Sequence, residues 1–239
     1  MRRVLLSLLL LVSCAAPDPR LSTPLQGSDQ AAKVTSEQAQ RAYDIISAID
    51  YIPFHYTADG CYARALYMAM ELAVNELPSS AQFIEGELAP DDYTWWTYHV
   101  ALMLLVGDAT EPTMIDPALA TRPLPLHDWI DLSHPAPGYR LFWVPGSVYA
   151  SDEVLANTTQ APMIESFAEL PAFKPQDIAD SCRWLHAYIG LEFNLSWPDR
   201  DAKRSRLIAR TRTLLGELRS LGKLTIDRLD CGAAGAIYP

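Results

Sequence analysis

The clearest helical segment of the chain begins at a cysteine, and this helix with the segments after it limits the possible folds more than any other feature. Residues 61–77 are rich in Ala, Leu, Met and Glu, and Pro78 ends the run. Aromatic and then aliphatic residues fill 93–106, which predicts a largely buried strand. Helices are also predicted over 36–49, 176–188 and 200–221, and strands over 113–116 and 138–144. A helix, then strands, then helices favours an α+β fold.

Charge and cysteine content exclude several classes of protein. The formal net charge is −10 and the isoelectric point is about 4.9, so the chain would repel polyphosphate, and nucleic acid is not an expected partner. The four cysteines are too few for a disulfide scaffold and too scattered for a zinc site. With 49% apolar residues, the chain can form a sizeable core.

The first residues predict export. Two arginines precede an apolar run that is too short to cross a membrane and that ends in Leu11-Val12-Ser13-Cys14. This ending resembles a bacterial lipobox, in which the cysteine is lipidated and becomes the first mature residue. We therefore expect an exported lipoprotein, periplasmic or at the cell surface and tethered to the membrane. An ordinary signal peptide cleaved near Ala15 is the alternative. The expected parts are a lipoprotein signal over 1–14, a flexible tether over 15–35 and a folded domain over 36–239.

Export makes an unpaired cysteine unusual, because free thiols outside the cytoplasm tend to be oxidised. A disulfide between Cys182 and Cys231 is plausible and leaves Cys61 unpaired, although connectivity does not follow from sequence and Cys61 could pair instead. Asp59-Gly60-Cys61 opens the best predicted helix, where free N–H groups and the helix dipole stabilise the reactive thiolate. Cys61 is therefore a candidate nucleophile, with a small buried helix residue as the alternative.

A thiolate nucleophile usually works with an imidazole that a carboxylate or amide orients. His99 lies inside the predicted strand. If Gly107 and Asp108 form a two-residue turn, the numbers of directly opposed residues sum to 215, and Asp116 faces His99. Because Pro112 cannot donate to a strand ladder, a longer loop would shift this register but keep Asp116 on the adjacent strand. A core histidine satisfied by the backbone is the alternative.

Three short motifs resemble those of one enzyme family. Asp59-Gly60-Cys61-Tyr62-Ala63-Arg64-Ala65 resembles the nucleophile motif of bacterial protein-glutaminases, which deamidate glutamine side chains within proteins. Trp96-Thr97-Tyr98-His99-Val100-Ala101 resembles the histidine motif of that family, and Ile115-Asp116-Pro117 its aspartate motif, in the same order. The resemblance covers about residues 54–129. The family usually carries a histidine where this chain has Leu66.

The resemblance implies a papain- and transglutaminase-like α+β fold, in which the nucleophile-bearing helix packs on an antiparallel sheet and additional helices follow. The domain over 36–239 would then be catalytic. Cys61 would attack the side-chain amide of a protein-bound glutamine, His99 would move the proton, and Asp116 would orient the imidazole. Ammonia would leave, and water would hydrolyse the thioester without a metal or cofactor. The expected partner is a protein or peptide that bears glutamine.

Other interpretations of the same residues remain. A transglutaminase or a cysteine peptidase would use the same triad, and a non-catalytic surface lipoprotein would only bind a peptide in the cleft. Trp95, Trp96 and Trp129 could line a substrate cleft or pack in the core. A polar stretch could bind a metal, although loop polarity explains it equally well: His127, Asp128, Asp131 and His134. Basic residues of the last predicted helix favour a solvated face, with a partner or an anionic membrane surface as the alternative: Lys203, Arg204, Arg206, Arg210 and Arg212.

Overall fold

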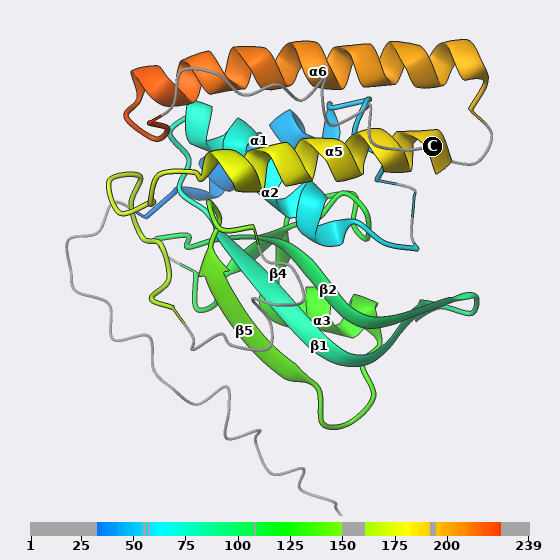
Figure 1. Ribbon diagram of the computed structural model, residues 1–239. Coiled ribbons are helices and arrows are strands. Elements are labelled where there is room, and N and C mark those ends of the chain that lie inside the picture. The colour runs from blue at the N-terminus through cyan, green and yellow to red at the C-terminus, as the bar shows by residue number, and fades with distance from the viewer. Residues whose placement is uncertain are drawn as a thin grey trace, which may run out of the picture. The chain divides into compact units, whose positions relative to one another are not determined.

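The computed structural model describes residues 33–54, 56, 58–107, 109–149, 161–191 and 195–225. Helices combine with a five-stranded sheet of order β4-β3-β2-β1-β5, in which all strand pairs are antiparallel (Figure 1). The helices are α1 (Ser36–Ser47), α2 (Cys61–Val74), α3 (Leu126–Ser133), α5 (Pro175–Leu191) and α6 (Trp197–Ser220). The strands are β1 (Ser80–Asp91), β2 (Thr94–Leu104), β3 (Thr113–Ile115), β4 (Leu124–Pro125) and β5 (Arg140–Pro145). The expected α+β fold is confirmed.

The sheet separates two hydrophobic cores, because side chains alternate between its faces. Phe83 of β1 pairs with Val100 of β2, and both point into a core shared with α1, α2, α5 and α6. The next pair along, Ile84 with His99, lies on the opposite face, where Ile84 packs with Trp129 of α3. Figure 1 shows the four helices on one side of the sheet and α3 on the other. We call these the α2-side core and the α3-side core.

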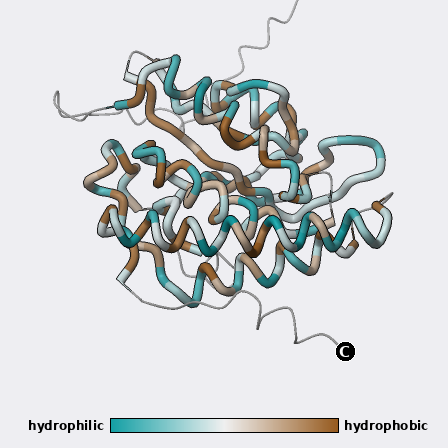
Figure 2. The backbone as a smooth tube through the Cα atoms, turned by 90° about the horizontal axis from the view of Figure 1, so that it is seen from above, coloured by the Kyte–Doolittle hydropathy of each residue, from teal (hydrophilic) through white to brown (hydrophobic). Residues whose placement is uncertain are grey.

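Helix α2 lies in the centre of the α2-side core, in contact with β2, α5, α6 and α1. Every residue from Ala63 to Ala73 is buried, and the alanines among them allow the neighbouring helices to approach closely. The outer helices are amphipathic instead. Along them hydrophilic and hydrophobic residues alternate (Figure 2), and α6 turns Leu207, Leu214 and Leu218 inward.

The helix ends follow capping chemistry. At the start of α1 the Thr35 hydroxyl accepts from the Gln38 N–H, while the Gln38 side chain accepts from the Thr35 N–H. Helix α2 ends at Val74, three residues before the predicted end, because Glu76 takes a left-handed conformation and the Leu77 N–H bonds back to the Leu72 carbonyl.

Three elements of the structure are absent from the sequence-based expectations: β1, α3 and the two-residue β4. Strand β1 is missing from them because its hydrophobic alternation breaks at two register shifts, between Glu85 and Leu88 and between Leu88 and Asp91. Helix α3 occupies part of the stretch that reads as a polar loop. Its buried residues Leu126, Trp129, Ile130 and Ser133 have helical spacing.

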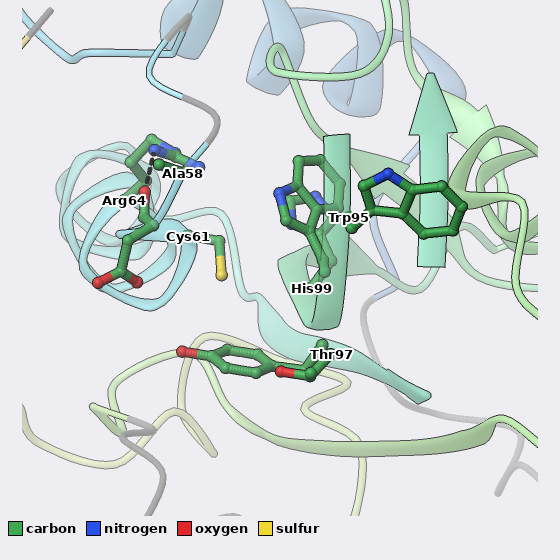
Figure 3. A pocket seen from close by; sticks show the side chains of 9 residues that line it. Ala58, Cys61, Arg64, Trp95, Thr97 and His99 are labelled. Atoms are coloured by element: carbon green, nitrogen blue, oxygen red, sulfur yellow. Dashed lines mark hydrogen bonds between the residues drawn. The ribbon is translucent and has the colours of Figure 1, made fainter. Parts of the chain in front are cut away.

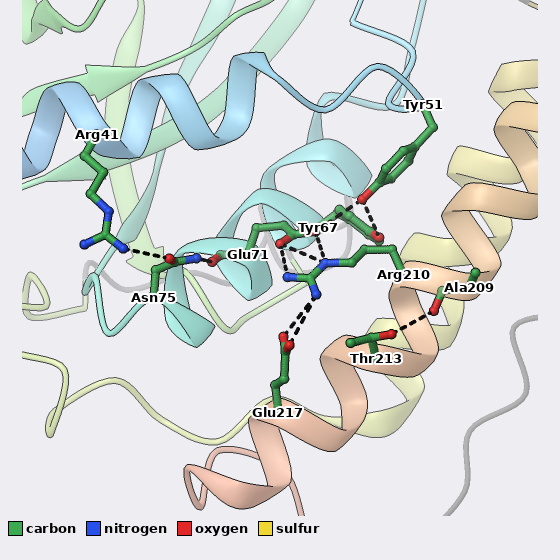
Figure 4. Close-up of polar contacts among 9 residues, drawn as sticks. All are labelled: Arg41, Tyr51, Tyr67, Glu71, Asn75, Ala209, Arg210, Thr213 and Glu217. Atoms are coloured by element: carbon green, nitrogen blue, oxygen red, sulfur yellow. Dashed lines mark hydrogen bonds and ion pairs between the residues drawn. The ribbon is translucent and has the colours of Figure 1, made fainter.

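The basic residues of α6 are not simply solvated. Arg210 forms hydrogen bonds with both carboxylate oxygens of the buried Glu71 on α2, with Nη2 at 2.7 Å from Oε2 (Figure 4). Tyr51 donates a hydrogen bond to the same carboxylate. Arg206 pairs with Asp50 at 3.1 Å. The prediction of a solvated face is therefore wrong for Arg210, which joins α6 to the central helix.

Several predictions concern residues outside the described part of the chain. These are the lipoprotein signal over 1–14 with Cys14, nearly all of the tether over 15–35, and Cys231. Cys182 is buried, with its Sγ 3.8 Å from the Thr211 hydroxyl oxygen, and the expected disulfide to Cys231 stays a prediction. Within the described residues, no helix has the length and apolarity that a membrane span requires.

Candidate active site

The candidate nucleophile, Cys61, is the first residue of α2 and lies in a pocket. Gly60 caps the helix with a left-handed backbone (φ 88°, ψ 8°), and the Cys61 side chain is largely buried and forms no disulfide with another described cysteine. Figure 3 shows Cys61 on the helix side of the pocket and His99 on the strand side. The pocket is lined by Ala58, Asp59, Cys61, Arg64, Trp95, Trp96, Thr97, Tyr98 and His99.

His99 and Asp116 form a buried pair beside this pocket. His99 Nε2 lies 2.7 Å from Asp116 Oδ2, and both residues are nearly inaccessible to solvent. The other carboxylate oxygen accepts a hydrogen bond from the Ala118 N–H at 3.1 Å. Because Nε2 is engaged by the carboxylate, Nδ1 is the ring nitrogen left to interact with Cys61.

The electrostatics of the pair favour a charged imidazolium. Burial alone would lower the pKa of His99, but the charge and hydrogen bond of Asp116, together with those of Cys61, raise it to about 9. Burial would likewise raise the pKa of Asp116. The charge and hydrogen bond of His99, the Trp129 hydrogen bond and the charge of Arg64 outweigh burial and lower it. At neutral pH the pair is therefore an imidazolium and a carboxylate.

Two tryptophans fix the side chains of this pair. The Trp129 indole N–H donates a 2.8 Å hydrogen bond to Asp116 Oδ2, the same oxygen that contacts His99. The His99 ring also stacks against Trp96, with ring centroids 4.7 Å apart, and against Trp129 at 5.7 Å. A side chain held in this way is preoriented for proton transfer.

The structure brings Cys61, His99 and Asp116 together, although the predicted register is wrong. Leu102 pairs with Ile115 and Leu104 with Thr113, so the numbers of opposed residues sum to 217 rather than 215. The β2–β3 connection is therefore longer than a two-residue turn. Because side chains alternate with a period of two, a shift of two residues keeps Asp116 on the face of His99, as a diagonal neighbour.

The three tryptophans expected at a cleft have different positions. Trp95 is 67% exposed and lines the pocket together with Trp96. Trp129 is fully buried and is not among the pocket residues, so of the two interpretations core packing holds for it. No sequence signal points directly to its hydrogen bond with Asp116. The helical spacing of the apolar residues around Trp129 could have predicted that its side chain faces the sheet.

The stretch considered for metal binding holds an exposed side-chain cluster. His127 interacts through its two ring nitrogens with Glu111 and Asp128. Among the described residues, no group of three or more His, Cys, Asp or Glu side chains is arranged to hold a metal ion.

A family comparison adds to this geometry. The family model described as glutaminase matches residues 33–132, the segment that holds Cys61, His99 and Asp116. The matched segment is less than half of the chain. The match indicates an amidohydrolase, and the candidate nucleophile, imidazole and carboxylate all lie in the matched segment.

Solved structures of protein-glutaminases are similar to this chain. The protein-glutaminase from Chryseobacterium proteolyticum, solved by NMR, is 22% identical over 69% of this chain and 92% of its own, with a TM-score of 0.51. A crystal structure of protein-glutaminase is 21% identical over 71% of this chain and 96% of its own, also with a TM-score of 0.51. At this identity the likeness shows the fold. No curated protein sequence matches the chain.

Proposed function

We propose that this protein is a glutaminase that deamidates glutamine side chains of proteins or peptides through a thioester on Cys61. The observation that carries the proposal is the buried pairing of His99 with Asp116 beside the helix-terminal Cys61, at one pocket. The match to the glutaminase family model supports an amide substrate, and the solved structures with the same fold are of protein-glutaminases.

Formation of the thioester needs a nucleophile and an acid, and Cys61 and His99 supply them. The Cys61 sulfur attacks the amide carbon, and negative charge develops on the amide oxygen. The N–H groups at the start of α2, that of Cys61 among them, stabilise this charge. The His99 imidazolium gives its proton to the amide nitrogen, the C–N bond breaks, and ammonia leaves.

Hydrolysis of the thioester reverses the roles of His99. The imidazole, now neutral, takes a proton from water as the water oxygen attacks the acyl carbon. The C–S bond breaks, the Cys61 thiolate and the His99 imidazolium are restored, and glutamate is the product. Asp116 holds the ring with Nδ1 toward Cys61 and stabilises the imidazolium in both steps.

The test is to incubate the protein with a glutamine-rich protein substrate and to measure three products. We expect ammonia release, conversion of glutamine to glutamate by mass spectrometry and an intact substrate backbone, with no reaction by the Cys61→Ala protein as control. Cleavage of the backbone would indicate a peptidase, and incorporation of an added primary amine would indicate a transglutaminase. Equal ammonia release by both proteins would refute the role of Cys61, and no reaction at all would favour a peptide-binding protein.

We also propose that the enzyme is exported and anchored to a membrane through lipidated Cys14. The proposal is supported by the two arginines, the apolar run and the Leu11-Val12-Ser13-Cys14 sequence. A labelled fatty acid should enter the full-length protein in cells, and Cys14→Ser should abolish the labelling. Labelling that persists in Cys14→Ser would exclude this anchor.

A further inference from the structure

The turn that leads into Cys61 is held by a residue from a distant helix. Tyr188 of α5 donates a 2.6 Å hydrogen bond to Asp59 Oδ2, and Asp59 Oδ1 accepts a 2.6 Å hydrogen bond from the Gly60 N–H. The Asp59 carboxylate therefore links the Tyr188 hydroxyl to the backbone of the residue just before the nucleophile. Tyr188 lies outside residues 33–132, the segment that matches the glutaminase family.

The Tyr188 ring also packs directly against this turn. A Cβ atom added to Gly60 would lie 2.4 Å from Tyr188 Cε2, so the ring occupies the space that any other residue would need. Tyr56 stacks on the ring at 5.0 Å between centroids, and Trp184 at 5.6 Å. With stacked neighbours and a hydrogen-bonded hydroxyl, the ring has little freedom to leave Gly60.

The hydroxyl of Tyr188 keeps its donor role over a wide pH range. Burial, followed by the hydrogen bonds with Asp59 and Tyr62, raises the pKa of Tyr188 well above its ordinary value. The Tyr62 hydroxyl lies 3.1 Å from that of Tyr188. Because the single proton of Tyr188 goes to Asp59, the Tyr62 hydroxyl is the donor in this second contact.

Arg64 holds the same turn from the pocket side. Its Nη1 donates to the carbonyl oxygens of Tyr56 and Asp59, at 3.0 and 3.1 Å. The Asp59–Gly60 turn is thus fixed by Arg64 within the matched segment and by Tyr188 outside it. Gly60 sets the direction in which the Cys61 side chain and N–H leave the turn.

We propose that Tyr188 is a positioning residue of this enzyme, which acts through Asp59 and Gly60 to aim the Cys61 sulfur and N–H at the substrate amide. Helix α5, which lies outside the segment matched by the family model, then contributes to the active site. This inference rests on the proposed function where ammonia release is measured. The effect of Tyr188 on the reactivity of Cys61 can be measured without a substrate.

The test compares Tyr188→Phe with Tyr149→Phe. Tyr188→Phe keeps the ring and removes only the hydroxyl, so we expect kcat for ammonia release to fall about tenfold while KM stays nearly constant, because a misaimed nucleophile affects the chemical step. Alkylation of Cys61 by iodoacetamide at neutral pH should slow as well. Tyr149→Phe is the matched control, because the Tyr149 hydroxyl is buried near Tyr62 without a hydrogen-bond partner among the described residues. It should leave both rates unchanged.

A double-mutant cycle shows whether Tyr188 acts through Asp59. Asp59→Ala removes the link, so adding Tyr188→Phe to it should cause no further loss of kcat. Additive losses, or a Tyr188→Phe protein with unchanged kcat and alkylation, would overturn the proposal. If the wild-type protein released no ammonia, the proposed function would fail, yet the alkylation rates would still decide whether Tyr188 positions Cys61. Thermal unfolding of each variant separates a positioning effect from loss of the fold.

Discussion

Replacing His99 with alanine is expected to lower kcat for ammonia release by on the order of 10³-fold, because a positioned proton donor and acceptor is lost. His99 contacts both catalytic partners, through the hydrogen bond to Asp116 and the interaction with Cys61 that raises its own pKa. Alkylation of Cys61 at neutral pH should also slow, since no imidazole remains beside the sulfur to take its proton. Steady-state ammonia release and iodoacetamide kinetics measure the two effects.

The matched control for this variant is His127→Ala. His127 is exposed on α3, interacts with Glu111 and Asp128, and does not line the pocket. Its loss should leave kcat unchanged. A His99→Ala protein that folds normally and keeps activity within a few-fold of wild type would contradict the assigned role of His99.

Asp116→Asn is expected to lower kcat by on the order of 10²-fold at neutral pH and to change the pH profile. The charge of Asp116 helps to raise the pKa of His99 to about 9. The wild-type enzyme should therefore lose activity as the pH rises through about 9, where the imidazolium loses its proton. Without the carboxylate charge, this alkaline loss should begin at a clearly lower pH. Profiles of kcat/KM against pH measure the shift.

The free energy of unfolding should also decrease as the pH rises through the pKa of His99. Because the pKa of His99 is raised in the folded protein from an ordinary value of 6.5, its contribution to folding is complete below about pH 6.5 and disappears as the pH rises through about 9. Asp128→Asn, which removes an exposed carboxylate beside His127, is the control and should not shift the profile of kcat/KM against pH. An alkaline limb that is identical in Asp116→Asn and wild type would show that Asp116 does not set the charge of His99.

Two members of the candidate triad carry a local signal in the sequence, and Asp116 follows from its place on the adjacent strand. Cys61 begins the most regular helix, and His99 is a polar residue inside an apolar strand. The error in register does not separate His99 from Asp116, since it amounts to two residues and the side-chain period of a strand is two. A shift of one residue would have placed the carboxylate on the opposite face of the sheet.

The residues and the strand that hold the site in place could not be predicted, because their roles depend on tertiary contacts. Tyr188 lies 129 residues beyond Asp59 in the chain, and no periodicity indicates that their side chains meet. Trp129 lies in a helix whose exposed polar residues obscure its apolar face. Strand β1 carries bulges that break its alternation, so the pattern does not reveal this inner strand of the sheet.

The reacting groups are anchored in different layers of the fold. Cys61 belongs to the α2-side core, whereas Asp116 is held by Trp129 of the α3-side core. A slight sliding of one layer over the other would part sulfur from imidazole while both layers stay packed, and a misplacement of about 1 Å can cost on the order of 10²-fold in rate. A variant can therefore lose turnover while it keeps its fold, and an intact circular dichroism spectrum does not guarantee an active enzyme.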